Sequence, residues 1–124
     1  MRIYYAHSLS LYGTEQEKRD VKLLEDLGFE VENPNQKCHQ EGYKAYTLKF
    51  PDQSPMIYFT DLVLTCDALA FRAFVDFKIG GGVFKEAMAA KKAGKPVIEL
   101  PTLLPYRGME RKETVQYLQE LGQR

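Results

Sequence analysis

The sequence predicts an α/β fold, a three-layer domain built on a mostly parallel sheet of four to five strands. Short β-type runs alternate with apolar helical stripes along the 124-residue chain. Two of the stripes are followed by glycines, Gly28 and Gly94, where helices commonly end. The opening order of strand, helix and strand predicts a right-handed crossover between parallel strands. Such alternation is typical of helices layered on a parallel sheet.

The first elements can be followed residue by residue. Residues 2–6 predict the first strand, and residues 7–13 predict a polar loop. Thr14 precedes Glu17 by three positions, which is the spacing of a capping box at a helix start. The helical stripe that follows consists of Val21, Leu23, Leu24 and Leu27. Residues 29–32 then predict the second strand.

The segment from residue 33 to residue 53 has no clear periodicity. It is polar and contains Pro34, Gly42 and Pro51. A loop of this length in a small domain is often functional, so one expectation is a lid. The other is a helical turn followed by a surface loop. Both remain open from the sequence.

The second half continues the alternation. Ser54 and Pro55 predict a helix start, because serine caps helices and proline is favoured at the first helical position. The expected helix runs to about residue 66 and buries Ile57, Leu62 and Leu64. The remaining elements are a strand at 68–74, a loop at 75–82, a helix at 83–93, a strand at 96–100 and a closing helix at 111–121. We therefore expect one Rossmann-like domain over residues 1–124.

Composition excludes several classes of protein. Seventeen basic residues balance seventeen acidic ones, which argues against a partner that is polymeric nucleic acid. No apolar run is long enough to span a membrane, and the start MRIYYAHS does not read as a signal peptide, so we expect a cytoplasmic protein. Cys38 and Cys66 show no paired metal spacing, and His7 and His39 are far apart in sequence. No metal site is predicted.

Chemistry is expected beyond the carboxyl ends of the strands, where ligands bind in open parallel sheets. After the third strand come Gly80, Gly81 and Gly82, directly before a helix. Glycines let a ligand approach the backbone, and a helix N-terminus favours an anion such as phosphate. A tight structural turn explains the glycines equally well. The loop after the first strand adds candidate binding residues, of which His7, Ser8 and Ser10 are the chief ones.

Two further residues are candidates for catalysis. Glu86 falls near the start of the helix after the glycines, and Tyr4 is expected at the end of the first strand. A carboxylate and a hydroxyl on adjacent elements can meet in the cleft. From position alone, Glu86 could equally be a surface residue stabilised by the helix dipole. Tyr4 could equally be a core aromatic.

These residues belong to short blocks that resemble the nucleoside 2-deoxyribosyltransferase-like superfamily, which includes the 2′-deoxynucleoside 5′-phosphate N-hydrolases. The blocks are IYYAHS at residues 3–8, TCDALA at residues 65–70, GVFKE at residues 82–86 and GKPVI at residues 94–98. Their order and spacing agree with the family pattern. The resemblance implies that Glu86 is a nucleophile at the anomeric carbon, that Tyr4 orients it, and that no cofactor is required.

The sequence departs from that pattern at two positions. Gly80 stands where many transferases have an aspartate six residues before the nucleophile, and Phe59 stands where the family has its base-side aspartate. Asp61 is the nearest carboxylate and becomes the candidate acid. Asp67, the aspartate of the TCDALA block, is a candidate for binding substrate. The N-hydrolase branch fits better, because Ser8, Ser10 and Gly82 are candidates to hold a 5′-phosphate.

The function that follows is cleavage or transfer at the N-glycosidic bond of a nucleoside or its 5′-monophosphate. The alternative is a non-catalytic protein that senses or sequesters a nucleotide on the same fold. A weaker alternative is an adaptor that binds a partner through the aromatic residues at 43–50. The resemblance also implies a homodimer or larger homo-oligomer, with the segment from Tyr106 onward near an interface.

Overall fold

The computed structural model describes residues 1–102 and 107–123. Its sheet has four parallel strands in the order β2-β1-β3-β4. They are β1 (Arg2–Ala6), β2 (Glu30–Glu32), β3 (Ala68–Phe71) and β4 (Val97–Glu99). The predicted Rossmann-like α/β fold is confirmed, and the predicted strands all form, although the third ends at Phe71 rather than at residue 74.

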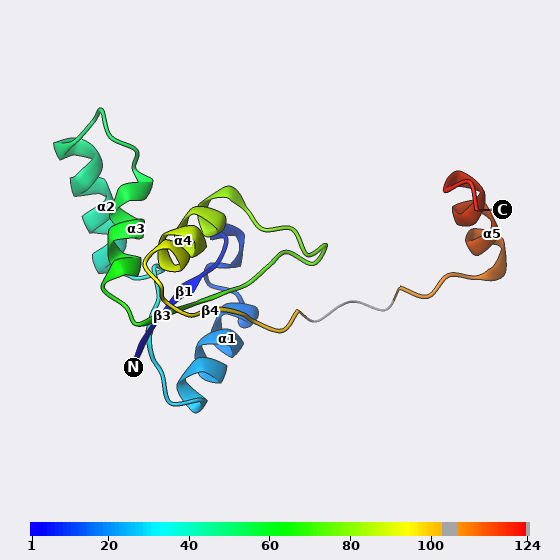
Figure 1. Ribbon diagram of the computed structural model, residues 1–124, viewed down its shortest axis with the longest axis horizontal. Helices are drawn as coiled ribbons and strands as arrows, with labels where there is room; N and C mark the ends of the chain where they lie inside the picture. The colour runs from blue at the N-terminus through cyan, green and yellow to red at the C-terminus, as the bar shows by residue number, and fades with distance from the viewer. Residues whose placement is uncertain (103–106, 124) are drawn as a thin grey trace.

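Strand β1 lies in the middle of the sheet, and its alternating side chains build two separate cores. Tyr4 and Ala6 pack on one face with Leu69, under helices α3 (Met56–Leu64) and α4 (Gly81–Lys92). Ile3 and Tyr5 pack on the other face, under helix α1 (Glu15–Asp26). Figure 1 shows α4 and α1 on opposite sides of the strands. Tyr4 therefore points toward α4, which is the helix that carries Glu86.

The start of α1 and the C-terminal ends of α1 and α4 follow their sequence signals, whereas α3 has Pro55 rather than Ser54 at its N-cap position and no side-chain cap. The Thr14 side chain accepts a hydrogen bond from the Glu17 backbone N–H at the start of α1. The Glu17 side chain does not accept the second hydrogen bond of a capping box, from the Thr14 backbone N–H. It accepts instead from the backbone N–H of Gly13. Gly28 and Gly94 both adopt positive φ after α1 and α4, as expected for residues that end a helix.

The segment at 33–53 contains a helix that the sequence did not predict. Helix α2 (Lys37–Lys49) has no side-chain cap and carries a glycine in its interior, so local signals for it are weak. Its stability comes from packing on α3, where Tyr43 stacks on Phe59 at 5.4 Å between ring centroids. Figure 1 shows α2 and α3 side by side at one end of the sheet. The expectation of a long loop is wrong because tertiary contacts override weak local propensity.

Smaller differences have local causes. In α3 the buried residue is Val63, whereas Leu64, which was expected in the core, is 49% exposed. The first turn of α4 starts at Gly81, two residues earlier than expected, because Phe84 N–H donates to the Gly80 carbonyl. Tyr4 lies in the middle of β1 and not at its end.

The predicted closing helix forms as α5 (Arg111–Glu120), but it buries no residue and lies apart from the sheet in Figure 1. Tyr106, from which the segment near an interface was expected to begin, falls outside the described residues. Within residues 1–102 and 107–123, no helix is long and apolar enough to cross a membrane.

Candidate active site

Tyr4 and Glu86 form a buried pair between the sheet and α4. Tyr4 is 0% exposed and Glu86 is 6% exposed. The Tyr4 hydroxyl donates a hydrogen bond to Oε2 of Glu86. The readings of Glu86 as a surface residue and of Tyr4 as a plain core aromatic therefore do not fit, because neither explains a buried carboxylate held by a buried phenol.

The environment of this pair changes the pKa of both groups. Burial raises the pKa of the Glu86 carboxyl from 4.5 to about 7, although the hydrogen bond from Tyr4 acts in the opposite direction. Burial, and then the neighbouring Glu86 charge, raise the pKa of the Tyr4 hydroxyl far above its ordinary value. Tyr4 thus stays a hydrogen-bond donor while Glu86 changes charge near neutral pH. Perturbed carboxyls of this kind are typical of functional sites.

The pair lies at the wall of a cavity of about 520 Å³. This volume falls within the range of small-molecule sites. The cavity is lined from five parts of the chain: β1, the loop after it, the segment after β2, the α2–α3 pair, and the start of α4. Its lining residues are Tyr4, His7, Ser8, Leu9, Tyr12, Pro34, Gln40, Tyr43, Lys44, Met56, Phe59, Gly80, Gly81, Gly82, Val83 and Glu86.

The glycine segment meets the cavity at the N-terminus of α4. Gly80 is the N-cap residue and offers no side-chain cap, and the first turn contains no acidic residue. None of Gly80, Gly81 and Gly82 adopts positive φ, so a tight turn does not require them. A Cβ added at Gly81 would meet nothing within 4 Å. The backbone N–H groups at this helix end, together with its positive dipole end, suit an anionic group of a ligand.

The loop after β1 supplies Ser8 and His7 to the cavity. Ser8 begins a short 3-10 helix, Leu9–Leu11, and its Oγ accepts from the backbone N–H of Ser10 at 3.3 Å. Ser10 itself is exposed and outside the lining, and its hydroxyl donates to Ser8 Oγ at 3.0 Å. Ser10 therefore holds Ser8 in place rather than facing the cavity.

His7 is held on both ring nitrogens. Its Nδ1 lies 3.0 Å from the Tyr5 carbonyl oxygen, and its Nε2 lies 2.7 Å from Oε2 of Glu17. The ring also stacks on Tyr5, with 3.8 Å between centroids. His7 thus presents to the cavity a ring whose nitrogens are already engaged, which makes it a wall and not a free acid or base.

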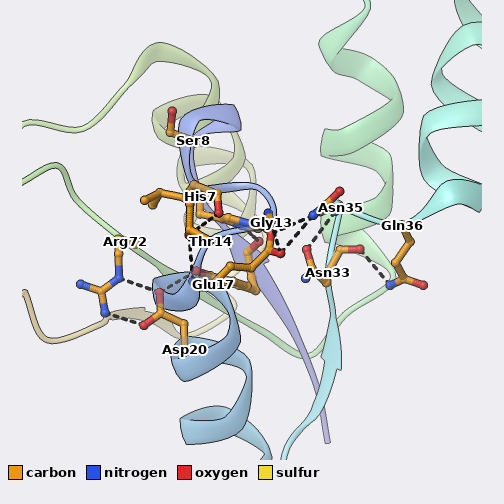
Figure 2. Close-up of polar contacts among 12 residues, drawn as sticks. His7, Ser8, Gly13, Thr14, Glu17, Asp20, Asn33, Asn35, Gln36 and Arg72 are labelled. Atoms are coloured by element: carbon orange, nitrogen blue, oxygen red, sulfur yellow. Dashed lines mark hydrogen bonds and ion pairs between the residues drawn. The ribbon is translucent and has the colours of Figure 1, made fainter.

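Figure 2 shows the polar network behind this wall. Asn35 donates to both carboxylate oxygens of Glu17. Burial alone would raise the pKa of Glu17, but the hydrogen bonds from His7, Asn35 and the backbone of Gly13 hold it below its ordinary value. The network ties the loop after β1 to α1 and to the segment after β2.

A second buried group sits beside it in Figure 2. The Arg72 guanidinium donates two hydrogen bonds of 2.6 Å to the Asp20 carboxylate, which also accepts from the Tyr5 hydroxyl at 2.5 Å. Such two-pronged pairs fix geometry strongly. They anchor the end of β3 against α1, so the loop that leads to the glycines starts from a fixed point.

Two predicted site residues lie outside the cavity lining. Asp61 is exposed on α3. Asp67 is also exposed, and its Oδ2 accepts from the backbone N–H of Arg2 at 2.8 Å. Asp67 therefore has a structural contact at the start of β1. The structure brings Tyr4, His7, Ser8 and the glycines together with Glu86, and it leaves Asp61, Asp67 and Ser10 apart from them.

Sequence reasoning missed the α2–α3 side of the cavity. Gln40, Tyr43 and Lys44 come from α2, the helix that was not predicted, and Phe59 comes from α3. The sequence signals for this side were the aromatic content of residues 43–50 and Phe59, which stands at the position of the family's base-side aspartate. Tyr12, on the loop after β1, is also a lining residue, and burial, aided by the Glu86 charge, raises its pKa to about 12.

Within the described part of the chain, no three histidine, cysteine or acidic side chains gather in a group that could hold a metal ion. The arrangement is instead a carboxylate on a ligand-sized cavity that is also lined by the N-terminus of α4 and by aromatic rings from α2 and α3. Comparison of the chain with models of known families, with curated proteins and with solved structures finds no match.

Proposed function

We propose that the protein cleaves or transfers at the N-glycosidic bond of a nucleoside, a deoxynucleoside or their 5′-monophosphates, with Glu86 as the nucleophile. The observation that carries this proposal is the Tyr4–Glu86 pair, buried at the wall of a cavity of about 520 Å³. The likeness of four sequence blocks to the nucleoside 2-deoxyribosyltransferase-like superfamily supports the same reaction.

The chemistry of the pair suits attack on an anomeric carbon. The hydrogen bond from Tyr4 engages Oε2 of Glu86, so attack falls to Oε1. As the bond from Oε1 to C1′ forms, the bond from C1′ to the base nitrogen breaks, and the electron pair leaves with the base. Water then attacks C1′, which releases the sugar and restores the carboxylate. In a transferase, a second base takes the place of water.

The rest of the cavity suits a nucleotide. The N-terminus of α4 and the Ser8 hydroxyl offer donors for a 5′-phosphate. The stacked rings of Tyr43 and Phe59 offer a flat apolar wall for a base. A sugar between these two ends would lie beside Glu86.

The test measures, by chromatography, the release of free base from a panel of nucleosides and nucleoside 5′-monophosphates. We expect release by the wild-type protein and none by Glu86→Ala. The matched control is Glu25→Ala, which removes an exposed glutamate from α1. Release by Glu86→Ala at the wild-type rate would remove Glu86 from the mechanism.

The second candidate is a protein that binds a nucleotide without turning it over. It is favoured by the position of Asp61, which is exposed and away from the cavity, so the candidate acid for the leaving base does not face the ligand. A pure binder would be stabilised against heat by a nucleotide and would release no base, with or without an added acceptor base.

A further inference from the structure

The α2–α3 side of the cavity is aromatic where a leaving base would stack. Tyr43 and Phe59 lie 5.4 Å apart between centroids, with 28° between their planes. Phe59 also makes an edge-on contact with Tyr58, with 5.2 Å between the ring centroids. Two rings from different helices therefore give this side of the cavity an aromatic surface for a flat ligand.

The side chains that line the cavity within the described residues include one carboxylate, which is Glu86. The nitrogens of His7 face the Tyr5 carbonyl and Glu17. The pKa of Tyr12 is about 12, which makes it a weak acid. Lys44 lines the cavity and is exposed to water, which screens its charge. A neutral leaving base needs a proton as its bond breaks, and His7, Tyr12 and Lys44 are poorly suited to supply it.

A base that is already cationic needs no such proton. The faces of aromatic rings attract cations, and an ionised carboxylate in the same cavity adds a negative charge. The cavity combines both, with the rings on α2 and α3 and the Glu86 carboxylate on α4.

We propose, resting on the function proposed above, that the preferred substrate is an N-glycoside whose leaving base carries a positive charge on the glycosidic nitrogen, as in an N-ribosylpyridinium. Phe59 and Tyr43 recognise the cationic ring. A 5′-phosphate, where the substrate has one, lies at the start of α4.

The reaction balances without a general acid. Oε1 of Glu86 forms a bond to C1′ while the bond from C1′ to the pyridinium nitrogen breaks. The electron pair moves to that nitrogen, so the cationic ring leaves as a neutral pyridine. Water then attacks C1′, Glu86 leaves as the carboxylate, and one proton goes to solvent.

The experiment measures base release from nicotinamide riboside and its 5′-monophosphate beside adenosine, cytidine, their 2′-deoxy forms and the matching monophosphates. We expect kcat/KM to be at least about 100-fold higher for the pyridinium substrates, because the missing proton transfer contributes roughly that factor. Equal or faster release from the neutral nucleosides would overturn this inference and leave the proposed function standing. No release from either group would overturn both.

A binding measurement separates recognition of the cationic ring from the greater chemical lability of the bond between the sugar and a pyridinium. The Glu86→Gln variant, which we expect to be inactive, is titrated with nicotinamide riboside and with its dihydro form, which has nearly the same shape and no charge. We expect the charged form to bind about 3- to 30-fold more tightly, as cation–aromatic contacts allow. Equal affinities would refute recognition by the rings.

Variants of Phe59 then assign that recognition. Phe59→Leu removes the aromatic face and is expected to raise KM for nicotinamide riboside about 3- to 30-fold. Phe59→Tyr keeps the face and is expected to leave KM within about twofold of wild type. Thermal unfolding checks that both variants fold. An unchanged KM in a folded Phe59→Leu protein would overturn the role given to this ring.

Discussion

The charge on the buried Glu86 carboxylate is expected to weaken the fold above neutral pH. Burial raises the pKa of this group from 4.5 to about 7, so the folded protein holds the proton more tightly than the unfolded chain does. Each tenfold difference in proton affinity is worth about 1.4 kcal/mol, which gives about 3 kcal/mol for this group. That stability is fully present below about pH 4.5 and is lost as the pH rises through about 7.

The substitution Glu86→Gln tests this reasoning, because glutamine keeps the shape and stays neutral at every pH. Relative to wild type, the variant is expected to gain about 2–3 kcal/mol in free energy of unfolding between about pH 5 and about pH 8.5. Urea unfolding at the two pH values measures the change, and any offset that does not depend on pH cancels in the comparison. The exposed Glu25, changed to glutamine, is the matched control. A difference between Glu86→Gln and wild type that is the same at both pH values would refute the buried, high-pKa carboxylate.

Three more predictions concern the surroundings of the site. Tyr4→Phe removes the hydrogen bond that lowers the pKa of the nucleophilic carboxyl, so the acid limb of the pH–rate profile for base release should move to higher pH; an unmoved limb would contradict the pair. Gly42→Ala places a Cβ 2.7 Å from Cζ of Tyr58 and should lower the free energy of unfolding by about 1–3 kcal/mol. Adding Tyr58→Leu to the same chain should relieve this loss. Stabilisation of the protein by Gly42→Ala alone would refute the clash. Asp20→Ala leaves the buried Arg72 guanidinium without its partner and should lower the free energy of unfolding, measured in urea, by about 3–5 kcal/mol. Adding Arg72→Met should recover part of this free energy. A loss under about 1 kcal/mol in Asp20→Ala would contradict the buried pair.

The order of strands and helices could be predicted because its signals are local. Thr14 caps α1 from within the sequence that it starts, and Gly28 and Gly94 take the positive φ that ends a helix. The short run of apolar, β-favouring residues in Arg2–Ala6 is enough to mark a strand, and the structure buries that strand on both faces. Such signals act over a few residues, so they can be recognised without knowledge of the tertiary structure.

Helix α2 could not be predicted because what stabilises it is distant in sequence. Its interior Gly42 reads as a helix breaker, yet the lack of a side chain there makes room for the Tyr58 ring on α3. His39 adds a contact from its Nδ1 to the Tyr58 hydroxyl at 2.9 Å. Because α2 was missed, its contribution to the cavity was missed as well.

The candidate site was predictable where the fold itself brings two elements together, and less so where it depends on how one helix is rotated. Tyr4 and Glu86 could be paired because a central strand and the helix packed on it bring them together. The placement of Asp61 depends on the rotation of α3 about its axis, and a helix of nine residues carries too few apolar positions to fix that rotation from sequence. The same uncertainty explains why Leu64 was expected inside and Val63 was found there.

The proposed mechanism requires a covalent bond between Glu86 and the anomeric carbon, and mass spectrometry can detect that bond. The wild-type protein is mixed with a nucleoside whose sugar carries fluorine at C2′, which slows release of the sugar from the enzyme, and the digested protein is then analysed. For the wild-type protein, the proposed mechanism predicts a single sugar adduct on the peptide that contains Glu86, together with one equivalent of free base. It predicts no adduct on the Glu86→Gln variant. Release of base with no adduct, or with an adduct on another residue, would contradict it.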